Sequence, residues 1–127
     1  MTGVRRAFLA CLGPSFLLAQ PARADQVHFT GTTTASETLI RDTLQTILRT
    51  AYLRTRCAAL SSVDAAILSP GYRPKDSRYR VGEGKRTYER WSVVLCGKTI
   101  KYLITFWPAA DGGTMFSIGD PYPPDAP

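Results

Sequence analysis

Histidine and cysteine, which carry much of enzyme and metal chemistry, are scarce in this chain. Its 127 residues include one histidine, His28, and three cysteines. A structural zinc site takes about four nitrogen or sulfur ligands, and a catalytic thiol needs a neighbouring base such as histidine. We therefore expect no bound metal ion and no other cofactor, and we expect a protein that is not an enzyme.

Long apolar runs are also missing, which argues against a membrane span, since one takes about 20 apolar residues. The longest mostly apolar run, residues 7–19, is interrupted by Gly13-Pro14. Two arginines precede this run and an Ala-Arg-Ala motif ending at Ala24 follows it, which is the arrangement of a secretory signal peptide. We expect residues 1–24 to be removed and the mature protein to be periplasmic or secreted. Adjacent arginines also occur in twin-arginine signals, so the export route stays open.

Part of the positive charge belongs to this export signal. The full chain has 16 basic and 10 acidic residues and a net charge of +6. Loss of the three arginines before Asp25 leaves 13 basic residues and a net charge of +3. That charge does not indicate nucleic-acid binding. The mature length fits a single domain, which we place at residues 25–119, followed by a Pro-rich tail, residues 120–127, that we expect to be extended and mobile.

Two of the three cysteines, Cys57 and Cys96, remain after the signal peptide is removed. An exported chain with two cysteines usually pairs them in its oxidising compartment. We therefore predict a Cys57–Cys96 disulfide. It would close a loop of about 40 residues and stabilise the domain by roughly 4 kcal/mol on the chain-entropy model.

Apolar residues three and four positions apart predict an amphipathic helix within residues 36–60. Ser36 can cap its first turn, and Ile40, Leu44 and Ile47 begin its apolar stripe. We expect a helix of roughly 22 residues.

Alternating strand formers in residues 91–108 predict a β-hairpin. A two-residue turn at Gly97-Lys98 would pair Leu95 with Ile100, and a four-residue loop over residues 96–99 would keep that pairing. The hairpin has a more apolar face, and if the helix covers that face, Cys96 points away from Cys57 unless the loop lets it swing round.

Two shorter segments can complete a sheet. Residues 63–69 are ambiguous between helix and strand, and their alternation favours a strand. Residues 114–119 can supply the last strand. The predicted fold class is α+β: one long N-terminal helix packed on a three- or four-stranded antiparallel meander, with one disulfide.

A basic segment, residues 72–90, precedes and enters the hairpin, and its turn-forming residues predict an exposed loop. Its tyrosines alternate with arginines, a combination that suits docking to an anionic partner. The candidate binding residues are Arg73, Arg78, Tyr79, Arg80, Lys85, Arg86 and Arg90. A solvated loop that only keeps the domain soluble is the alternative. We expect Glu89 to form an ordinary ion pair with the arginines around it.

Short motifs from residue 88 to residue 118 carry a resemblance to a group of proteins. They are Tyr88-Glu89-Arg90-Trp91, Cys96-Gly97-Lys98, Thr105-Phe106-Trp107-Pro108 and Gly112-Gly113-Thr114. In these motifs the chain resembles the C-terminal half of small exported bacterial proteins of unassigned function. The resemblance implies an exported α+β domain with a disulfide, and it brings no activity and no catalytic residue.

The expected function is that of an exported, non-enzymatic binding or structural protein of the bacterial envelope, in which the basic segment docks an anionic envelope component or protein. The alternative is an inhibitor of a secreted hydrolase. Small size, a disulfide and exposed loops suit insertion into a cleft, and the expected helix-on-sheet architecture is similar to cystatin-like folds.

Overall fold

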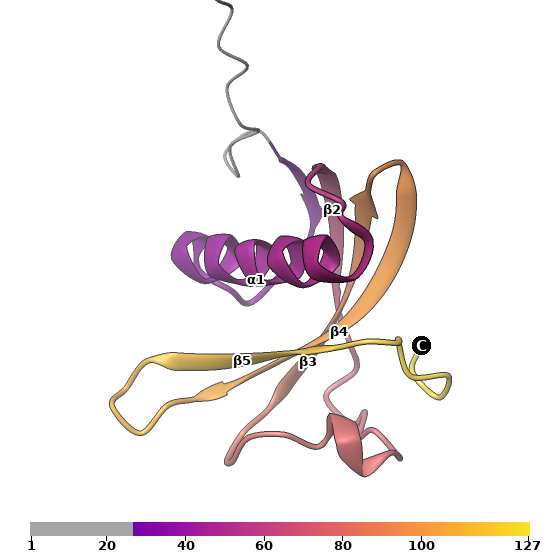
Figure 1. The fold of residues 1–127 in the computed structure, drawn as a ribbon. Helices are drawn as coiled ribbons and strands as arrows, with labels where there is room; N and C mark the ends of the chain where they lie inside the picture. Colours follow the sequence, from indigo (N-terminus) through magenta and orange to yellow (C-terminus); the bar gives the residue numbers. More distant parts are fainter. Residues whose placement is uncertain (1–26) are drawn as a thin grey trace, which may run out of the picture.

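The computed structural model describes residues 27–127, so the expected signal peptide lies outside the described residues. Residues 27–127 form one α-helix and five strands, with a short 3₁₀ turn between β2 and β3 (Figure 1). Their bounds are β1 His28–Gly31, α1 Glu37–Thr55, β2 Leu60–Ile67, β3 Thr87–Leu95, β4 Lys98–Pro108 and β5 Thr114–Gly119. Within the described part of the chain, no helix combines the length and the apolar character needed to cross a membrane.

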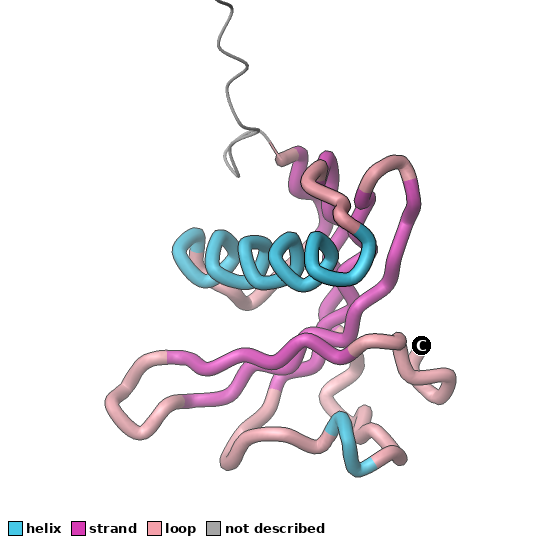
Figure 2. The backbone as a smooth tube through the Cα atoms, in the orientation of Figure 1, coloured by secondary structure: helices cyan, strands magenta, loops and turns pink. Residues whose placement is uncertain are grey.

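The five strands form one sheet in the order β1-β2-β3-β4-β5. β1 is parallel to β2, and the other neighbouring strands are antiparallel. The turn between β3 and β4 rises past the C-terminal end of α1, and the turn between β4 and β5 projects beneath its N-terminal end (Figures 1 and 2).

The predicted antiparallel meander of three or four strands is wrong, because the sheet has five strands and is mixed. The strand that we missed is β1, in the Thr-rich segment before the helix. Val27 and Phe29 pack against the core, while His28 and Thr30 are exposed, which is the alternation of a strand. β1 runs parallel to β2 because a helix connects them, as a parallel crossover requires.

The helix is also shorter than predicted, with 19 residues ending at Thr55. Ser36 is its N-cap, and the Ser36 hydroxyl accepts a hydrogen bond from the Leu39 amide at 3.2 Å. At the other end Arg56 adopts the left-handed conformation, with φ of 60°, and its amide donates to the Tyr52 carbonyl. This cap ends the helix early, so the next residues can turn into β2.

The β-hairpin is confirmed, but its turn lies one residue before the predicted position, so that Leu95 faces Lys98 instead of Ile100. Leu95 pairs with Lys98 and Val93 pairs with Ile100, so the turn residues are Cys96 and Gly97. Their φ angles of 48° and 77° are both positive, as a type I′ turn requires. Because the register differs by two residues, every side chain keeps its predicted face.

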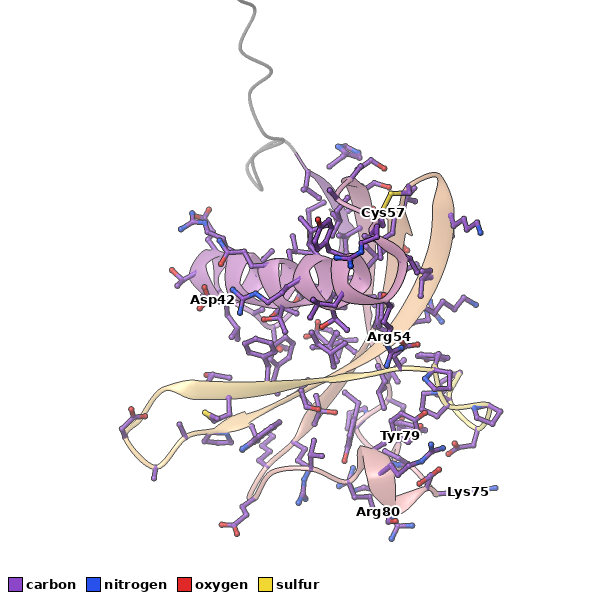
Figure 3. The ribbon with its side chains drawn as sticks, viewed as in Figure 1. Asp42, Arg54, Cys57, Lys75, Tyr79 and Arg80 are labelled. Carbon is purple, nitrogen blue, oxygen red and sulfur yellow. A yellow bond between two sulfur atoms is a disulfide. The ribbon has the colours of Figure 1, made fainter. Side chains whose placement is uncertain are left out.

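The disulfide between Cys57 and Cys96 is confirmed, with the two Cα atoms 6.0 Å apart. Cys96 belongs to the turn rather than to a strand, and its amide donates to the Ala59 carbonyl at 2.9 Å. The bridge therefore joins the end of α1 to the tip of the hairpin (Figure 3). We expected that Cys96 would point away from Cys57 if the helix covered the apolar face of the hairpin. This conflict does not arise, because Cys96 is a turn residue and its side chain does not follow the alternation of the strands.

The main core lies between α1 and one face of the sheet. Trp91, Val93 and Ile104 are fully buried there, and Ile47 is fully buried on the helix side. Of residues 63–69, which were ambiguous between helix and strand, residues 63–67 lie in β2, where Val63 and Ala65 are buried in the same core.

Candidate functional site

The basic segment forms most of the connection between β2 and β3 and the first part of β3. A 3₁₀ turn at Ser77–Tyr79 organises its middle. Asp76 caps this turn, since its side chain accepts a hydrogen bond from the Arg78 amide at 2.9 Å. The segment is therefore an ordered connection with internal hydrogen bonds.

The tyrosines of the basic segment are turned inward. Tyr79 and Tyr88 are buried with Leu68 and Leu103 in a second apolar cluster. Tyr72 packs against this cluster and meets the Tyr88 ring edge-on, with the ring centroids 5.5 Å apart. The structure therefore makes Tyr79 an anchor of the segment and does not present its ring to a partner.

Burial affects the chemistry of Tyr72 as well as its packing. Burial, together with the nearby charge of Asp125, raises the pKa of Tyr72 to about 12. Both causes disfavour the phenolate form, because an anion is poorly solvated in an apolar site and is repelled by a carboxylate. The Tyr72 side chain is thus held in its neutral, protonated form.

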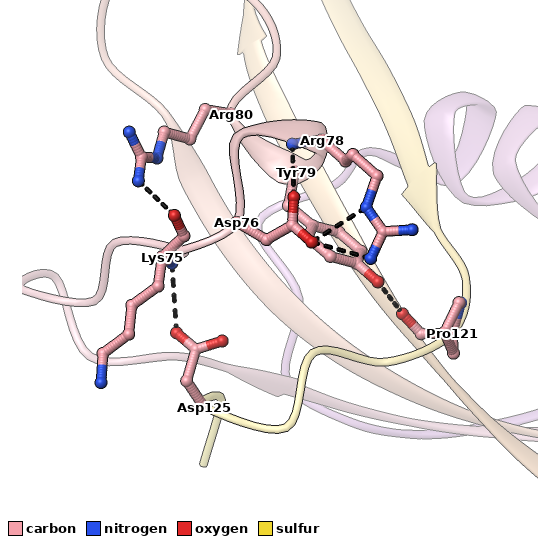
Figure 4. Close-up of polar contacts among 7 residues, drawn as sticks. All are labelled: Lys75, Asp76, Arg78, Tyr79, Arg80, Pro121 and Asp125. Carbon is pink, nitrogen blue, oxygen red and sulfur yellow. Dashed lines mark hydrogen bonds and ion pairs between the residues drawn. The ribbon is translucent and has the colours of Figure 1, made fainter.

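The Pro-rich tail packs against the basic segment, although the sequence predicted an extended and mobile tail. Pro123 is among the fully buried residues. The Tyr79 hydroxyl donates to the Pro121 carbonyl, and the Lys75 amide donates to the Asp125 carboxylate at 3.3 Å (Figure 4). The tail and the buried tyrosines therefore anchor the basic segment to the rest of the domain.

Three arginines of the segment, Arg73, Arg80 and Arg86, donate to carbonyl oxygens of the segment's own backbone or of Pro70 just before it. Arg73 donates to two carbonyls at 3.1 and 2.8 Å. The Nε of Arg80 donates to the Pro74 carbonyl at 2.8 Å, and the Nε of Arg86 donates to the Val81 carbonyl at 2.6 Å. Because a carbonyl group carries no net charge, these bonds orient the guanidinium groups and leave their positive charge uncompensated.

Arg78 is the exception, since it pairs with an acid. Its Nη2 lies 2.7 Å from the Asp76 carboxylate, and the side-chain hydrogen bond from Arg78 lowers the pKa of Asp76. The Arg78 side chain is 72% exposed, so the pair contributes little to stability. Figure 4 shows Lys75 and Arg80 on one side of the segment and Arg78 on the other.

The two remaining cationic candidates, Lys85 and Arg90, add positive charge to the surface of the segment. Lys85 is exposed and enters no ion pair of residues 27–127, and Arg90 donates to the Pro127 carbonyl at 3.2 Å. The structure thus places six of the seven candidates at least partly at the surface, all of them except Tyr79.

Glu89 does not form the ion pair that we expected. Its side chain is fully buried on the helix side of β3 and accepts four hydrogen bonds from neutral groups. One oxygen binds the amide and the hydroxyl of Thr34 at 2.8 and 2.7 Å. The other binds the Thr33 hydroxyl at 2.7 Å and the Trp91 indole N–H at 2.8 Å. Four donors match the acceptor capacity of a carboxylate.

This buried carboxylate ties the segment between β1 and α1 to the centre of the sheet. One feature of the sequence indicated that Glu89 is buried. It is two residues from Trp91 in the same strand, so both side chains fall on the face that α1 covers. The threonines that satisfy it are 55 and 56 residues away along the chain, so no local pattern could reveal them.

His28, the one histidine of the sequence, is exposed on the edge strand β1. Among residues 27–127 no group of three or more histidine, cysteine, aspartate or glutamate side chains is arranged to hold a metal ion. No protein-family model, curated protein or solved structure matches the chain.

Proposed function

We propose that the mature chain is an exported, non-enzymatic binding protein of the bacterial envelope and that it docks an anionic partner through the basic segment. The basic segment has seven cationic side chains, and among the described residues only one of them, Arg78, forms an ion pair with an acidic group. This excess of unpaired positive charge is the observation that carries the proposal. The disulfide between Cys57 and Cys96 supports an oxidising compartment.

Preorganisation supports binding by this surface. Arg73, Arg80 and Arg86 are already oriented by backbone carbonyls, and the buried tyrosines and the tail hold the segment that carries them. A partner would therefore order few additional groups, which lowers the entropic cost of association.

The chemistry of the partner follows from the guanidinium group. Arginine forms paired hydrogen bonds with phosphate and carboxylate oxygens, and it keeps its charge at any physiological pH. Lys75 adds a point charge beside Arg80 (Figure 4). Phosphate-bearing lipid headgroups and acidic glycans of the envelope both present such oxygens.

No observation favours the alternative of a hydrolase inhibitor. That hypothesis combined small size, a disulfide and exposed loops with the expected architecture of a helix on an antiparallel meander, and the mixed sheet of five strands removes the architectural support.

The test removes charge without disturbing the bonds that organise the segment. Lys75→Gln with Lys85→Gln removes two positive charges from side chains that make no hydrogen bond to the described residues. The matched control, Lys98→Gln with Lys101→Gln, removes two charges from exposed lysines of β4. The probes are phosphatidylglycerol vesicles for a lipid phosphate and a heparin column for an acidic glycan.

We expect the first pair of substitutions to weaken vesicle binding or to lower the salt concentration of elution from heparin, and the control pair to have a smaller effect. Equal effects of the two pairs would show that only net charge matters, and the proposal would then be wrong. The absence of binding to both probes by the unmodified protein would also reject it.

A further inference from the structure

One edge of the sheet is formed by β5, which lies beneath α1 in Figure 1. On one side β5 pairs with β4 along its whole length. Among residues 27–127, no strand pairs with its other side. The N–H and C=O groups that point outward from such an edge are available to pair with another strand.

The sequence of β5 lacks the features that usually prevent such pairing. Edge strands are commonly protected by charged side chains, by proline, by a bulge or by being very short. β5 reads TMFSIG, with no charged residue and no proline, and its register with β4 is unbroken. It has six residues, whereas β1 at the other edge has four. β5 is therefore the edge that is open to strand addition.

A groove of about 280 Å³ lies between α1 and β5. Its lining includes Thr50 and Arg54 from the helix, and Phe116 and Ile118 from the strand. Phe116 and Ile118 pack against the main core but are only partly buried. A strand added at this edge would cover the rest of their apolar surface with its own side chains.

The helix presents a row of exposed residues along this groove. The row consists of Asp42, Thr46, Thr50 and Arg54, which recur every four positions and so share one side of α1. Asp42 lines a cleft together with the start of β5, and Arg54 forms an ion pair with Asp120, just past the end of β5, at 2.6 Å. The row therefore runs in the same direction as β5, with an acid at one end and a base at the other.

We propose that β5 pairs in antiparallel fashion with β5 of a second copy of this chain, which joins the two five-stranded sheets into one. Such a contact has a two-fold axis, and the rotation reverses the direction of the row. Asp42 of each copy then lies on the side of Arg54 of the other copy, and Thr46 lies on the side of Thr50. This charge complementarity is the reason to assign the edge to a second copy.

The side chains of β5 also match under this symmetry. With the axis at Ser117, Phe116 lies opposite Ile118 of the second copy on the helix side of the sheet. On the other side, Met115, which is 49% exposed, lies opposite Gly119, which lines a hollow of about 130 Å³. The flexible side chain of methionine suits such an irregular space. The inference goes beyond the proposed function and does not rest on it.

Analytical ultracentrifugation of the mature protein tests the proposal. We expect a reversible equilibrium between monomer and dimer at concentrations up to about 500 µM, since the pairing of one short strand gives a small interface. A monomer at every concentration would overturn the proposal, whatever else this edge binds.

A charge at the proposed axis tests the register. Ser117→Lys places two like charges opposite each other, so we expect the dimer to weaken by at least about tenfold. The matched control is His28→Lys, which adds a lysine at an exposed position of the other edge strand and should leave dimerisation unchanged. Circular dichroism confirms that both variants fold. Equal effects of the two substitutions would overturn the proposal.

Charge reversal on the helix provides a second test, at exposed positions. In Asp42→Arg two arginines face each other across each contact, and in Arg54→Asp two aspartates do, so each variant alone should dimerise less. In an equimolar mixture every arginine of the row meets an aspartate, and we expect a heterodimer. Arg41→Asp, an exposed residue of α1 outside the row, is the control and should dimerise normally. A mixture that associates no better than its separate components would overturn the proposal.

Discussion

Substitution of Glu89 by glutamine tests the buried carboxylate most directly. Glutamine has nearly the same shape, but it replaces one acceptor oxygen with an NH₂ group that only donates. If the NH₂ group takes one position, it faces the Trp91 indole N–H, and if it takes the other, it faces the Thr34 amide. Neither of these donors can reverse its role, whereas the two threonine hydroxyls can rotate and accept.

The expected cost follows from this geometry. In either orientation one buried N–H group is left without an acceptor, which costs about 1 to 3 kcal/mol. The remaining hydrogen bonds become bonds between neutral groups and weaken further, since bonds to a charged group are worth about 1.5 to 3 kcal/mol each against about 1 for neutral pairs. We therefore expect Glu89→Gln to lower the free energy of unfolding by about 3 kcal/mol, equivalent to roughly 12 to 24 °C in Tm for a domain of this size.

Thermal unfolding followed by circular dichroism measures this loss. The matched control is Glu83→Gln, the same chemical change at an exposed position of the basic segment, which should alter Tm by no more than about 3 °C, equivalent to roughly 0.5 kcal/mol. If Glu89→Gln lowered Tm by no more than the control does, the four hydrogen bonds would not contribute as their geometry indicates.

Three further substitutions have expected outcomes. Replacing Cys57 and Cys96 by serine should cost about 4 kcal/mol, since the bridge closes a loop of about 40 residues; an unchanged Tm would show that the bridge is unimportant. Gly82→Ala should destabilise by about 1 to 3 kcal/mol through overlap with the Trp107 indole ring, and Gly84→Ala, also at positive φ but with open space around it, should cost less; equal losses would reject the overlap. In the folded state Tyr72 has a pKa of about 12, whereas a tyrosine in the unfolded chain has a pKa of about 10. The protonated Tyr72 therefore contributes its full stabilisation below pH about 10, and this stabilisation is lost as the pH rises from about 10 to about 12. Tyr72→Phe should therefore reduce the alkaline loss of stability in urea unfolding, and an unchanged pH dependence would contradict this assignment.

Local patterns predicted the elements that depend on neighbouring residues. The apolar stripe of the helix, its Ser36 cap and the alternation in the β3–β4 hairpin are all present. Strand β1 was missed because it has only four residues, too few for alternation to be distinguished from a Thr-rich loop. Its identity as a strand depends on β2, which supplies every one of its backbone partners.

The candidate site shows a similar division. Composition located the positive charge in residues 72–90, and six of the seven candidates lie at least partly at the surface. The exposed role expected for Tyr79 failed, because Leu68, Leu103 and the tail, all distant in sequence, surround its ring. A tyrosine among arginines has the same local pattern whether it faces a partner or a second core.

By itself, the sequence determined which residues alternate between faces, where the helix begins and which two cysteines of the expected mature chain were available to pair. These properties depend on periodicity and residue type, which act over a few neighbouring positions. Only the tertiary structure decided the parallel fifth strand, the turn at Cys96-Gly97, the burial of Glu89 and the groove between α1 and β5. Each of these depends on groups far apart in the chain, whose packing and hydrogen bonding are satisfied only when the whole domain has folded.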